Sequence, residues 1–393
     1  MTLIVIGANP EVARAAETLP GDVVHVQLPG APAGEGTSPV LTVDFRRDSD
    51  FLEFVDSTLR PLAPTAVVSL TELGLEPAAA AAERLGCLGV SPAVVRATRD
   101  KLEMRRILER RAPHLNPAFA AGDDAEAVAR LFAGHPLVVA KPVDGAGSMA
   151  IRLLERPEQL PPENRTGGTL LEQFAGGREF SVEAFSEGGR HTVVGIAEKG
   201  TTDGFVEVSH LMPAPSLDAA GRRLVERAVA ELLDAVGLTD GPSHTEVKLD
   251  GERVVVIETH NRPGGDGIAE LVRLTTGIHW RRVALGWPIG EGLRREEAAA
   301  GAAAKVFFTA APGLVERVAE QPELGRGRVV DWEVSVSVGD LVQPLRSSAD
   351  RLGVATLAAD GVAECVAAVA ELTAVQVVVT RPVESAGADQ AES

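Results

Sequence analysis

Short apolar runs alternate with amphipathic stretches over the first 95 residues of the chain. The run at residues 2–7 ends at Gly7, and a helix-like stretch extends from Pro10 to about Leu19. Further strands are predicted at Val23–Leu28, Ala66–Leu70 and Cys87–Val90. Helices between them are predicted at Phe51–Leu59 and Glu76–Leu85. This alternation predicts a small α/β domain with a parallel sheet.

From Thr98 the pattern changes to a mixed α+β arrangement. A charged stretch at Asp100–Arg111 and a long amphipathic stretch at Ala219–Val236 predict helices. An apolar run at Leu137–Lys141 predicts a strand, and Asp250-Gly251 between two strand-like runs predicts a hairpin turn. The other predicted strands are Gly168–Gln173, Glu179–Phe185, Val193–Ala197, Glu207–Leu211, His244–Leu249 and Val254–Thr259.

A third, β-rich part is predicted near the C-terminus. It follows an Ala/Glu-rich stretch at 291–304, which reads as a linker or a helix. Strand-like runs at Lys305–Thr309 and Asp331–Val338 open this part. The last residues, from about Glu384, are rich in Ser, Ala, Gly and Asp, a composition typical of disorder.

Composition and charge exclude several classes of partner. The 393 residues carry 38 Lys and Arg against 56 Asp and Glu, a formal net charge of −18. Such a field repels nucleic acid and anionic lipid, so we expect neither as a partner. The two cysteines lack metal-ligand spacing, and the N-terminal apolar run is too short for a signal peptide or a membrane span. A cytoplasmic protein is therefore expected.

The segment from Val138 to Ser148 combines a strand, a lysine and a loop of small residues. Lys141 lies at the end of the strand, and Gly145, Gly147 and Ser148 follow in the loop. A loop that wraps a triphosphate needs small side chains, because its backbone N–H groups must approach the phosphate oxygens. The segment favours nucleotide binding, although an ordinary glycine-rich turn after an edge strand would look the same.

Two pairs of glutamates point to polar ligand contacts. Glu172 and Glu179 flank a glycine turn and could accept hydrogen bonds from adenine or ribose, or be ordinary solvated glutamates. Glu246 and Glu258 lie on the two strands of the predicted hairpin, where cross-strand partners are about 5 Å apart. Two carboxylates that close repel each other unless a cation lies between them, and oxygen ligands favour Mg²⁺ bridging to phosphates.

Taken together, these motifs resemble the ATP-grasp superfamily, and within it the carboxylate–amine ligases such as bacterial L-amino acid ligases and dipeptide synthetases. The resemblance rests on Thr98-Arg-Asp-Lys101, Ala-Lys141-Pro, the glycine loop, and the run from Glu258 to Asp266. It implies an ATP-grasp fold of α/β and α+β domains in four parts. Residues 1–97 would form an N-terminal Rossmann-like pre-ATP-grasp domain, and residues 98–300 an ATP-grasp domain with a mobile lobe at about 142–205. Residues 301–383 would form a β-rich C-terminal lobe, and residues 384–393 a disordered tail.

The resemblance also implies a role for each motif residue. Lys101 and Lys141 would contact the α- and β-phosphates under the loop of Gly145, Gly147 and Ser148. Glu172 and the main chain near Phe174 and Ala175 would read adenine, and Glu179 would hold the ribose. Arg262 would steady the transferred phosphoryl group and the acyl phosphate. The implied metal site is Glu246 and Glu258 with His260, and the implied substrate contacts are His244, Gly264 and Gly265.

One position departs from the family pattern. Relatives have Glu-x-Asn on the second metal strand, whereas here His260 takes the asparagine position and Asn261 follows it. A shift by one residue on a strand turns Asn261 to the opposite face. Three alternatives follow: His260 ligates or abuts a metal, the strand bulges here, or only one Mg²⁺ is held as tightly as in relatives. His244 is a general base for the amine, a group that orients it, or a structural histidine.

The implied function is an ATP-dependent ligase. It would activate a small carboxylate as an acyl phosphate, join it to an amine in an amide or dipeptide-type bond, and release ADP and phosphate. ATP and Mg²⁺, or Mn²⁺ in its place, are the expected cofactors, and a homodimer is compatible with the resemblance. One alternative is an ATP-grasp carboxylase or a formate-dependent purine-precursor transformylase. An alternative of another class is a non-catalytic nucleotide-binding regulatory protein.

Overall fold

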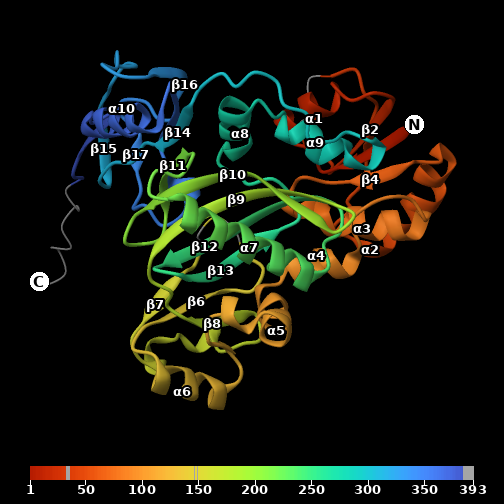
Figure 1. Ribbon diagram of the computed structural model, residues 1–393, viewed down its shortest axis with the longest axis horizontal. Helices are drawn as coiled ribbons and strands as arrows, with labels where there is room; N and C mark the ends of the chain where they lie inside the picture. The colour runs from red at the N-terminus through yellow and green to blue at the C-terminus, as the bar shows by residue number, and fades with distance from the viewer. Residues whose placement is uncertain (32–35, 146, 148, 384–393) are drawn as a thin grey trace, which may run out of the picture.

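The computed structural model describes residues 1–31, 36–145, 147 and 149–383. Ser148, predicted in the phosphate loop, and the predicted disordered tail 384–393 lie outside these residues. Within them the chain forms an N-terminal domain, a small lobe, a large central sheet and a C-terminal part (Figure 1). No described helix is both long and apolar enough to cross a membrane.

The N-terminal domain is the predicted parallel sheet. Its order is β3-β2-β1-β4, with β1 (Thr2–Ile6), β2 (Asp22–Gln27), β3 (Val40–Thr42) and β4 (Ala66–Val68). The helices that accompany it are α1 (Pro10–Ala16), α2 (Asp48–Phe54), α3 (Glu72–Leu85) and α4 (Pro92–Arg99).

One predicted strand of this domain is wrong. Cys87–Val90 forms a single bridge, between Leu88 and Ala66, and no strand. Gly86 caps the end of α3 in a left-handed conformation and Ser91 caps the start of α4, so the segment between the two helices is too short for a ladder.

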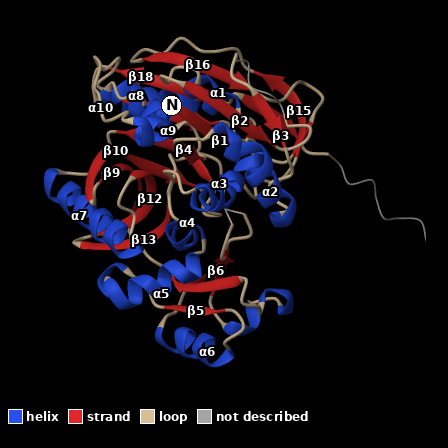
Figure 2. Cartoon of the chain, turned by 90° about the vertical axis from the view of Figure 1, so that its right-hand side faces the viewer, coloured by secondary structure: helices blue, strands red, loops and turns tan. Residues whose placement is uncertain are grey.

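The small lobe is an antiparallel sheet. Its order is β5-β8-β6-β7, with β5 (Phe119–Ala121), β6 (Val138–Pro142), β7 (Arg152–Leu154) and β8 (Thr169–Gln173). In Figure 2, α5 (Lys101–Arg111) and α6 (Ala125–Gly134) lie on opposite sides of β5, and α6 packs Val128 and Leu131 into this lobe's core.

The central sheet has eight strands in the order β13-β12-β9-β10-β11-β14-β18-β16. The helix α7 (Ala219–Val236) covers it by packing Val225 and Val229 against Phe180 and Val182, while α8 (Ile268–Thr276) and α9 (Trp280–Gly286) follow β13. The strands up to β13 are β9 (Arg178–Glu187), β10 (Arg190–Thr201), β11 (Glu207–Met212), β12 (Gly241–Asp250) and β13 (Arg253–His260).

This order changes two expectations. Strands β9 and β10, which the predicted mobile lobe 142–205 includes, belong to the middle of the central sheet. The C-terminal strands β14, β18 and β16 continue the same sheet, because β14 supplies the backbone partners that β11 would otherwise lack at its open edge. The third part is therefore joined to the second by a continuous ladder.

The C-terminal part adds a second, three-stranded sheet with the order β17-β15-β19. The stretch 291–301 contains neither helix nor strand, so the linker interpretation is confirmed for it. The predicted strand Asp331–Val338 begins and ends earlier, at Arg328–Val334. The elements are β14 (Ala302–Phe307), β15 (Gly313–Val318), β16 (Arg328–Val334), β17 (Leu341–Val342), β18 (Gly353–Ala359), α10 (Val362–Ala374) and β19 (Val378–Arg381).

Candidate active site

One cavity gathers most of the residues that the motifs single out. It has a volume of about 210 Å³ and lies between the small lobe and the central sheet, with side chains of both in its wall. The predicted site residues that line it are Lys101, Lys141, Gly145, Gly147, Glu172, Phe174, Ala175, Glu179, His244, Glu246, Glu258, His260, Arg262 and Gly265.

Glu246 and Glu258 face each other across the β12–β13 hairpin. They are direct cross-strand partners, and Ile257 is an extra, bulged residue beside Glu258. Lys199 Nζ lies 2.8 Å from Oε1 of Glu246, and Lys101 Nζ lies 3.0 Å from Oε2 of Glu258. Burial raises the pKa of Glu246, but Lys199 and His244 together outweigh it and lower this pKa to about 2. Both carboxylates are therefore ionised at neutral pH.

A buried ion-pair network fixes Lys141. Its Nζ lies 2.7 Å from Oε1 of Glu172, whose carboxylate also receives Arg105 Nη2 at 2.9 Å. The Arg105 side chain is fully buried and donates a further hydrogen bond to the carbonyl of Ile257. Burial raises the pKa of Glu172, but Arg105 and Lys141 reverse the effect and keep it below its usual value. Glu172 thus positions Lys141; its predicted contact with adenine stays a prediction.

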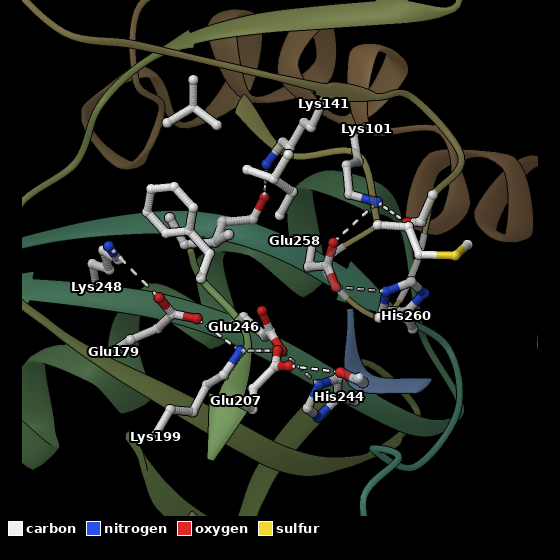
Figure 3. Close-up of a pocket in the computed structure, with 18 of the residues that line it drawn as sticks. Lys101, Lys141, Glu179, Lys199, Glu207, His244, Glu246, Lys248, Glu258 and His260 are labelled. Carbon is white, nitrogen blue, oxygen red and sulfur yellow. Dashed lines mark hydrogen bonds and ion pairs between the residues drawn. The ribbon is translucent and has the colours of Figure 1, made fainter. Parts of the chain in front are cut away.

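The end of the cavity near β8 is apolar. Lys248 Nζ lies 5.0 Å from the centre of the Phe174 ring and 3.6 Å from Oε2 of Glu179 (Figure 3). An aromatic slot with a cation over one ring and a carboxylate at its edge suits a purine and a ribose. The apolar side chains here are Pro117, Val139, Ile151, Phe174, Phe205 and Ile257.

The described residues of the glycine loop border the cavity beside Lys101. The ammonium of Lys101 donates to the carbonyl oxygen of Gly145, and Gly147 has a left-handed backbone with φ of 67°. Both glycines line the cavity. The loop therefore lies within reach of the lysines that the motif predicts as phosphate ligands.

Arg262 and His260 share an acidic partner that the sequence motifs did not identify. Arg262 Nε donates to Oε1 of Glu72 at 2.6 Å, and His260 Nδ1 lies 3.0 Å from the same oxygen. Glu72 begins α3 of the N-terminal domain. Burial raises the pKa of Glu72, but His260 and Arg262 outweigh it and hold the pKa well below its usual value. The N-terminal domain thus fixes the side chain of Arg262 at the cavity.

The structure decides part of the question raised at positions 260 and 261. His260 Nε2 lies 3.2 Å from Oε1 of Glu258, so His260 abuts the candidate metal carboxylate. Asn261 points to the opposite face, as predicted, where its Oδ1 accepts a hydrogen bond from Thr98. The bulge at Ile257 precedes Glu258 and does not bring Asn261 back into the cavity.

His244 is held by a fully buried carboxylate. Its Nδ1 lies 2.6 Å from Oε1 of Glu183, which also accepts hydrogen bonds from Gly264 N and Trp280 Nε1. Burial lowers the pKa of His244, but Glu183 and Glu246 outweigh it and raise the pKa to about 9. The contact with Glu183 fixes the ring, and the general-base, orienting and structural roles of His244 stay predictions.

The two glycines predicted to face substrate differ in their surroundings. A Cβ at Gly264 would lie 2.6 Å from Nδ1 of His244, closer than real Cβ contacts, so the close neighbour here is protein. Gly265 has no atom within 4 Å of its Cβ position and lines the cavity. The predicted contacts of both glycines with substrate stay predictions.

Several charged residues of the site escaped the sequence motifs. Lys199 on β10 and Glu207 on β11 line the cavity, and so does Ser348, whose hydroxyl donates to Oε2 of Glu207 at 2.9 Å. Asp266 forms a two-bond ion pair with Arg351 of the C-terminal part. The sequence pattern could have indicated that Lys199 is buried. On an extended strand its side chain points to the same face as that of Ala197, which is buried.

The donor set suits a hard divalent cation that is shared with phosphates. Within the described residues, no three His, Cys, Asp or Glu side chains converge tightly enough to enclose a metal by themselves. Mg²⁺ usually takes one or two carboxylates and completes its shell with water and phosphate oxygens. Glu246 and Glu258, both ionised and facing each other, fit that requirement.

Comparisons with known proteins match two separate parts of the chain. Residues 134–270 match the ATP-grasp domain, and residues 306–380 match the L-amino acid ligase C-terminal domain 2. The chain is 26% identical over 270 residues to an alanine–anticapsin ligase of Bacillus subtilis, a match that covers 61% of this chain and 57% of the relative. The chain thus matches only about half of the length of that curated relative.

Solved structures confirm the predicted fold. The L-amino acid ligase from Bacillus licheniformis superposes with a TM-score of 0.78 at 24% identity, covering 98% of this chain and 99% of the other. The biotin carboxylase domain of a Hydrogenobacter thermophilus 2-oxoglutarate carboxylase, solved with MgADP, superposes with a TM-score of 0.67 at 17% identity, covering 91% and 86%.

Proposed function

We propose that this chain, which carries an ATP-grasp domain followed by an L-amino acid ligase C-terminal domain, is an ATP-dependent carboxylate–amine ligase. The observation that carries the proposal is the convergence of five groups on one cavity: Lys101, Lys141, Glu246, Glu258 and Arg262. The two lysines lie beside a glycine loop and can bind phosphates, and the two facing carboxylates can bind a metal. The arginine can bind a transferred phosphoryl group.

In this proposal the nucleotide extends along the cavity. The apolar slot at Phe174 receives adenine, and Glu179 accepts hydrogen bonds from the ribose hydroxyls. Lys101 and Lys141 meet the phosphates. Glu246 and Glu258 hold Mg²⁺, or Mn²⁺ in its place, which supplies charge neutralisation at the phosphates when bound.

The protein then acts mainly by positioning the substrates and stabilising their charges, and no covalent bond to the protein is needed. An oxygen of the substrate carboxylate bonds to the γ-phosphorus as the bond to ADP breaks, and Arg262 steadies the charge of the acyl phosphate that results. The amine nitrogen next bonds to the acyl carbon, the bond to phosphate breaks, and the amine loses a proton. Protonated His244 can donate to a substrate carboxylate or to the developing oxyanion.

The C-terminal match favours this ligase over its rivals. A carboxylase shares the fold, since a biotin carboxylase domain superposes well, but residues 306–380 match the L-amino acid ligase domain. A regulatory protein without catalysis has no need for Arg262 and two facing, ionised carboxylates in one cavity.

The test is phosphate release from ATP with pairs of amino acids, and mass spectrometry of the product. Wild-type protein should release phosphate only when both a carboxylate and an amine substrate are present, and Glu258→Gln should lower kcat at least about 100-fold. Glu252→Gln, on the exposed turn of the same hairpin, is the matched control and should keep full activity. Rapid phosphate release without amine, or an active Glu258→Gln protein, would refute the proposal.

A further inference from the structure

Lys199 is a buried lysine for which the proposed reaction has no stated use. It lies on β10, and its side chain is 2% exposed. Its Nζ lies 2.7 Å from Glu179, 2.8 Å from Glu246 and 3.2 Å from Glu207, in each case at Oε1. Figure 3 shows the ammonium between these carboxylates. They come from β9, β12 and β11, so one side chain ties together three strands of the central sheet.

Two of these carboxylates have proposed roles at different parts of the nucleotide. Glu179 is the proposed ribose ligand and Glu246 a proposed metal ligand. An ammonium group has three N–H donors, and each of the three carboxylates lies within reach of one. Lys199 and His244 both contact Oε1 of Glu246, at 2.8 Å and 3.5 Å. Lys199 therefore helps to fix this carboxylate in the cavity wall.

The charges of the cluster give Lys199 a second effect. Three carboxylates that share one ammonium carry a net charge of −2 when these four groups are counted alone, since one positive charge meets three negative ones. Without the ammonium, repulsion would favour rotation of the carboxylates away from one another. Lys199 thus holds the three carboxylates in place, with a residual charge that a divalent cation can neutralise.

We propose that Lys199 is a positioning residue that couples the ribose end of the nucleotide site to its metal end. The proposal rests on the nucleotide-binding function proposed above and adds a specific consequence. Ordering of Glu179 by a nucleotide and ordering of Glu246 by a metal share the same ammonium. Loss of Lys199 should therefore weaken nucleotide binding, and also reduce the factor by which Mg²⁺ strengthens it.

The experiment measures ADP affinity by isothermal titration calorimetry, with and without Mg²⁺, on the full chain. Lys199→Met should weaken binding of ADP at saturating Mg²⁺ at least tenfold and shrink the Mg²⁺ enhancement. Lys305→Met is the matched control, because Lys305 is a buried lysine on β14 of the same sheet that donates to Thr356 outside the cavity. It should bind ADP as the wild type does.

A conservative variant keeps the test valid if Lys199→Met does not fold. Lys199→Arg retains the charge, but its planar fork cannot direct donors to three carboxylates at once, so it should still lose at least threefold in affinity for ADP with Mg²⁺. Wild-type affinity in either variant, with only a lowered melting temperature, would overturn the coupling. If wild-type protein itself fails to bind ADP, the proposed function fails instead.

Discussion

Replacement of Arg351 by methionine tests how the C-terminal part supports the cavity. Arg351 Nη1 and Nη2 lie 2.8 Å and 2.6 Å from the two carboxylate oxygens of Asp266, and its guanidinium carbon lies 3.7 Å from the centre of the Phe307 ring. The side chains of the pair are 12% and 25% exposed. Asp266 follows Gly265 in the cavity wall and has a left-handed backbone, with φ of 54°.

The magnitude follows from these contacts. Loss of one partner lowers the free energy of unfolding by about 3–5 kcal/mol for a fully buried ion pair and by about 0–1 kcal/mol for a pair at the surface. The Arg351–Asp266 pair has two hydrogen bonds and is partly exposed, so its loss should lower this free energy by about 2 kcal/mol. The cation–π contact with Phe307 adds about 0.5–1 kcal/mol. We therefore expect Arg351→Met to lower the free energy of unfolding by about 2–3 kcal/mol at pH 7.

The pH dependence has a definite sign. Burial raises the pKa of Asp266, but Arg351 and His210 outweigh it and hold the folded-state pKa well below the usual 3.8. The stability that this carboxylate contributes is complete above pH 3.8 and is lost as the pH falls through the lower, folded-state pKa. Urea unfolding of wild type and Arg351→Met should therefore differ by the full amount at pH 7 and by less at pH 3.

A double-mutant cycle of Arg351→Met and Asp266→Asn tests this reasoning, because it measures the coupling energy between the two positions. The coupling between the two positions should exceed about 1 kcal/mol at pH 7. A coupling below about 0.5 kcal/mol would show that the pair does not hold the cavity wall. Arg346→Met, an exposed residue in the same loop, is the control and should change stability by less than about 0.5 kcal/mol. The KM for the substrates should rise in Arg351→Met while the KM for ATP stays the same.

Three further substitutions test the contacts around the cavity. Gly264→Ala would place a Cβ 2.6 Å from Nδ1 of His244 and should destabilise the protein by about 1–3 kcal/mol in urea unfolding. Glu72→Gln removes the charge that orients Arg262, the proposed ligand of the transferred phosphoryl group, and should lower kcat between about tenfold and hundredfold in the phosphate-release assay, with ADP affinity unchanged. Arg105→Met leaves Glu172 paired with lysine alone and should cost about 3–5 kcal/mol of stability and weaken nucleotide binding.

Local patterns were sufficient to predict the central hairpin. Apolar alternation on both strands and a glycine turn predicted the two strands, but a turn at Asp250-Gly251 would pair Glu246 with Val255. The later turn and the bulge at Ile257 make Glu246 and Glu258 partners. The turn itself lies one residue later than predicted, at Gly251 and Glu252, because Asp250 still pairs with Arg253. The displacement of Asn261 to the opposite face also followed from strand periodicity alone.

The residues that were missed depend on contacts between distant parts of the chain. The predicted third helix began at Glu76, whereas α3 begins at Glu72 and contains Pro77. The predicted strand around Val193–Ala197 stopped where its apolar run stops, although β10 continues to Thr201 and carries Lys199 into the cavity. Burial of these charges is decided by their partners on other elements, which a local pattern does not contain.

The ion pairs of the site indicate how binding of a nucleotide would begin. Lys101 starts α5 and Lys141 lies near the end of β6 in the small lobe, and each is paired with a glutamate. A phosphate that attracts Lys101 takes it from Glu258, and that carboxylate then needs a new cation. Exchange of partners keeps the charge of the cavity balanced at each step, so phosphate and metal are expected to bind more tightly together than separately.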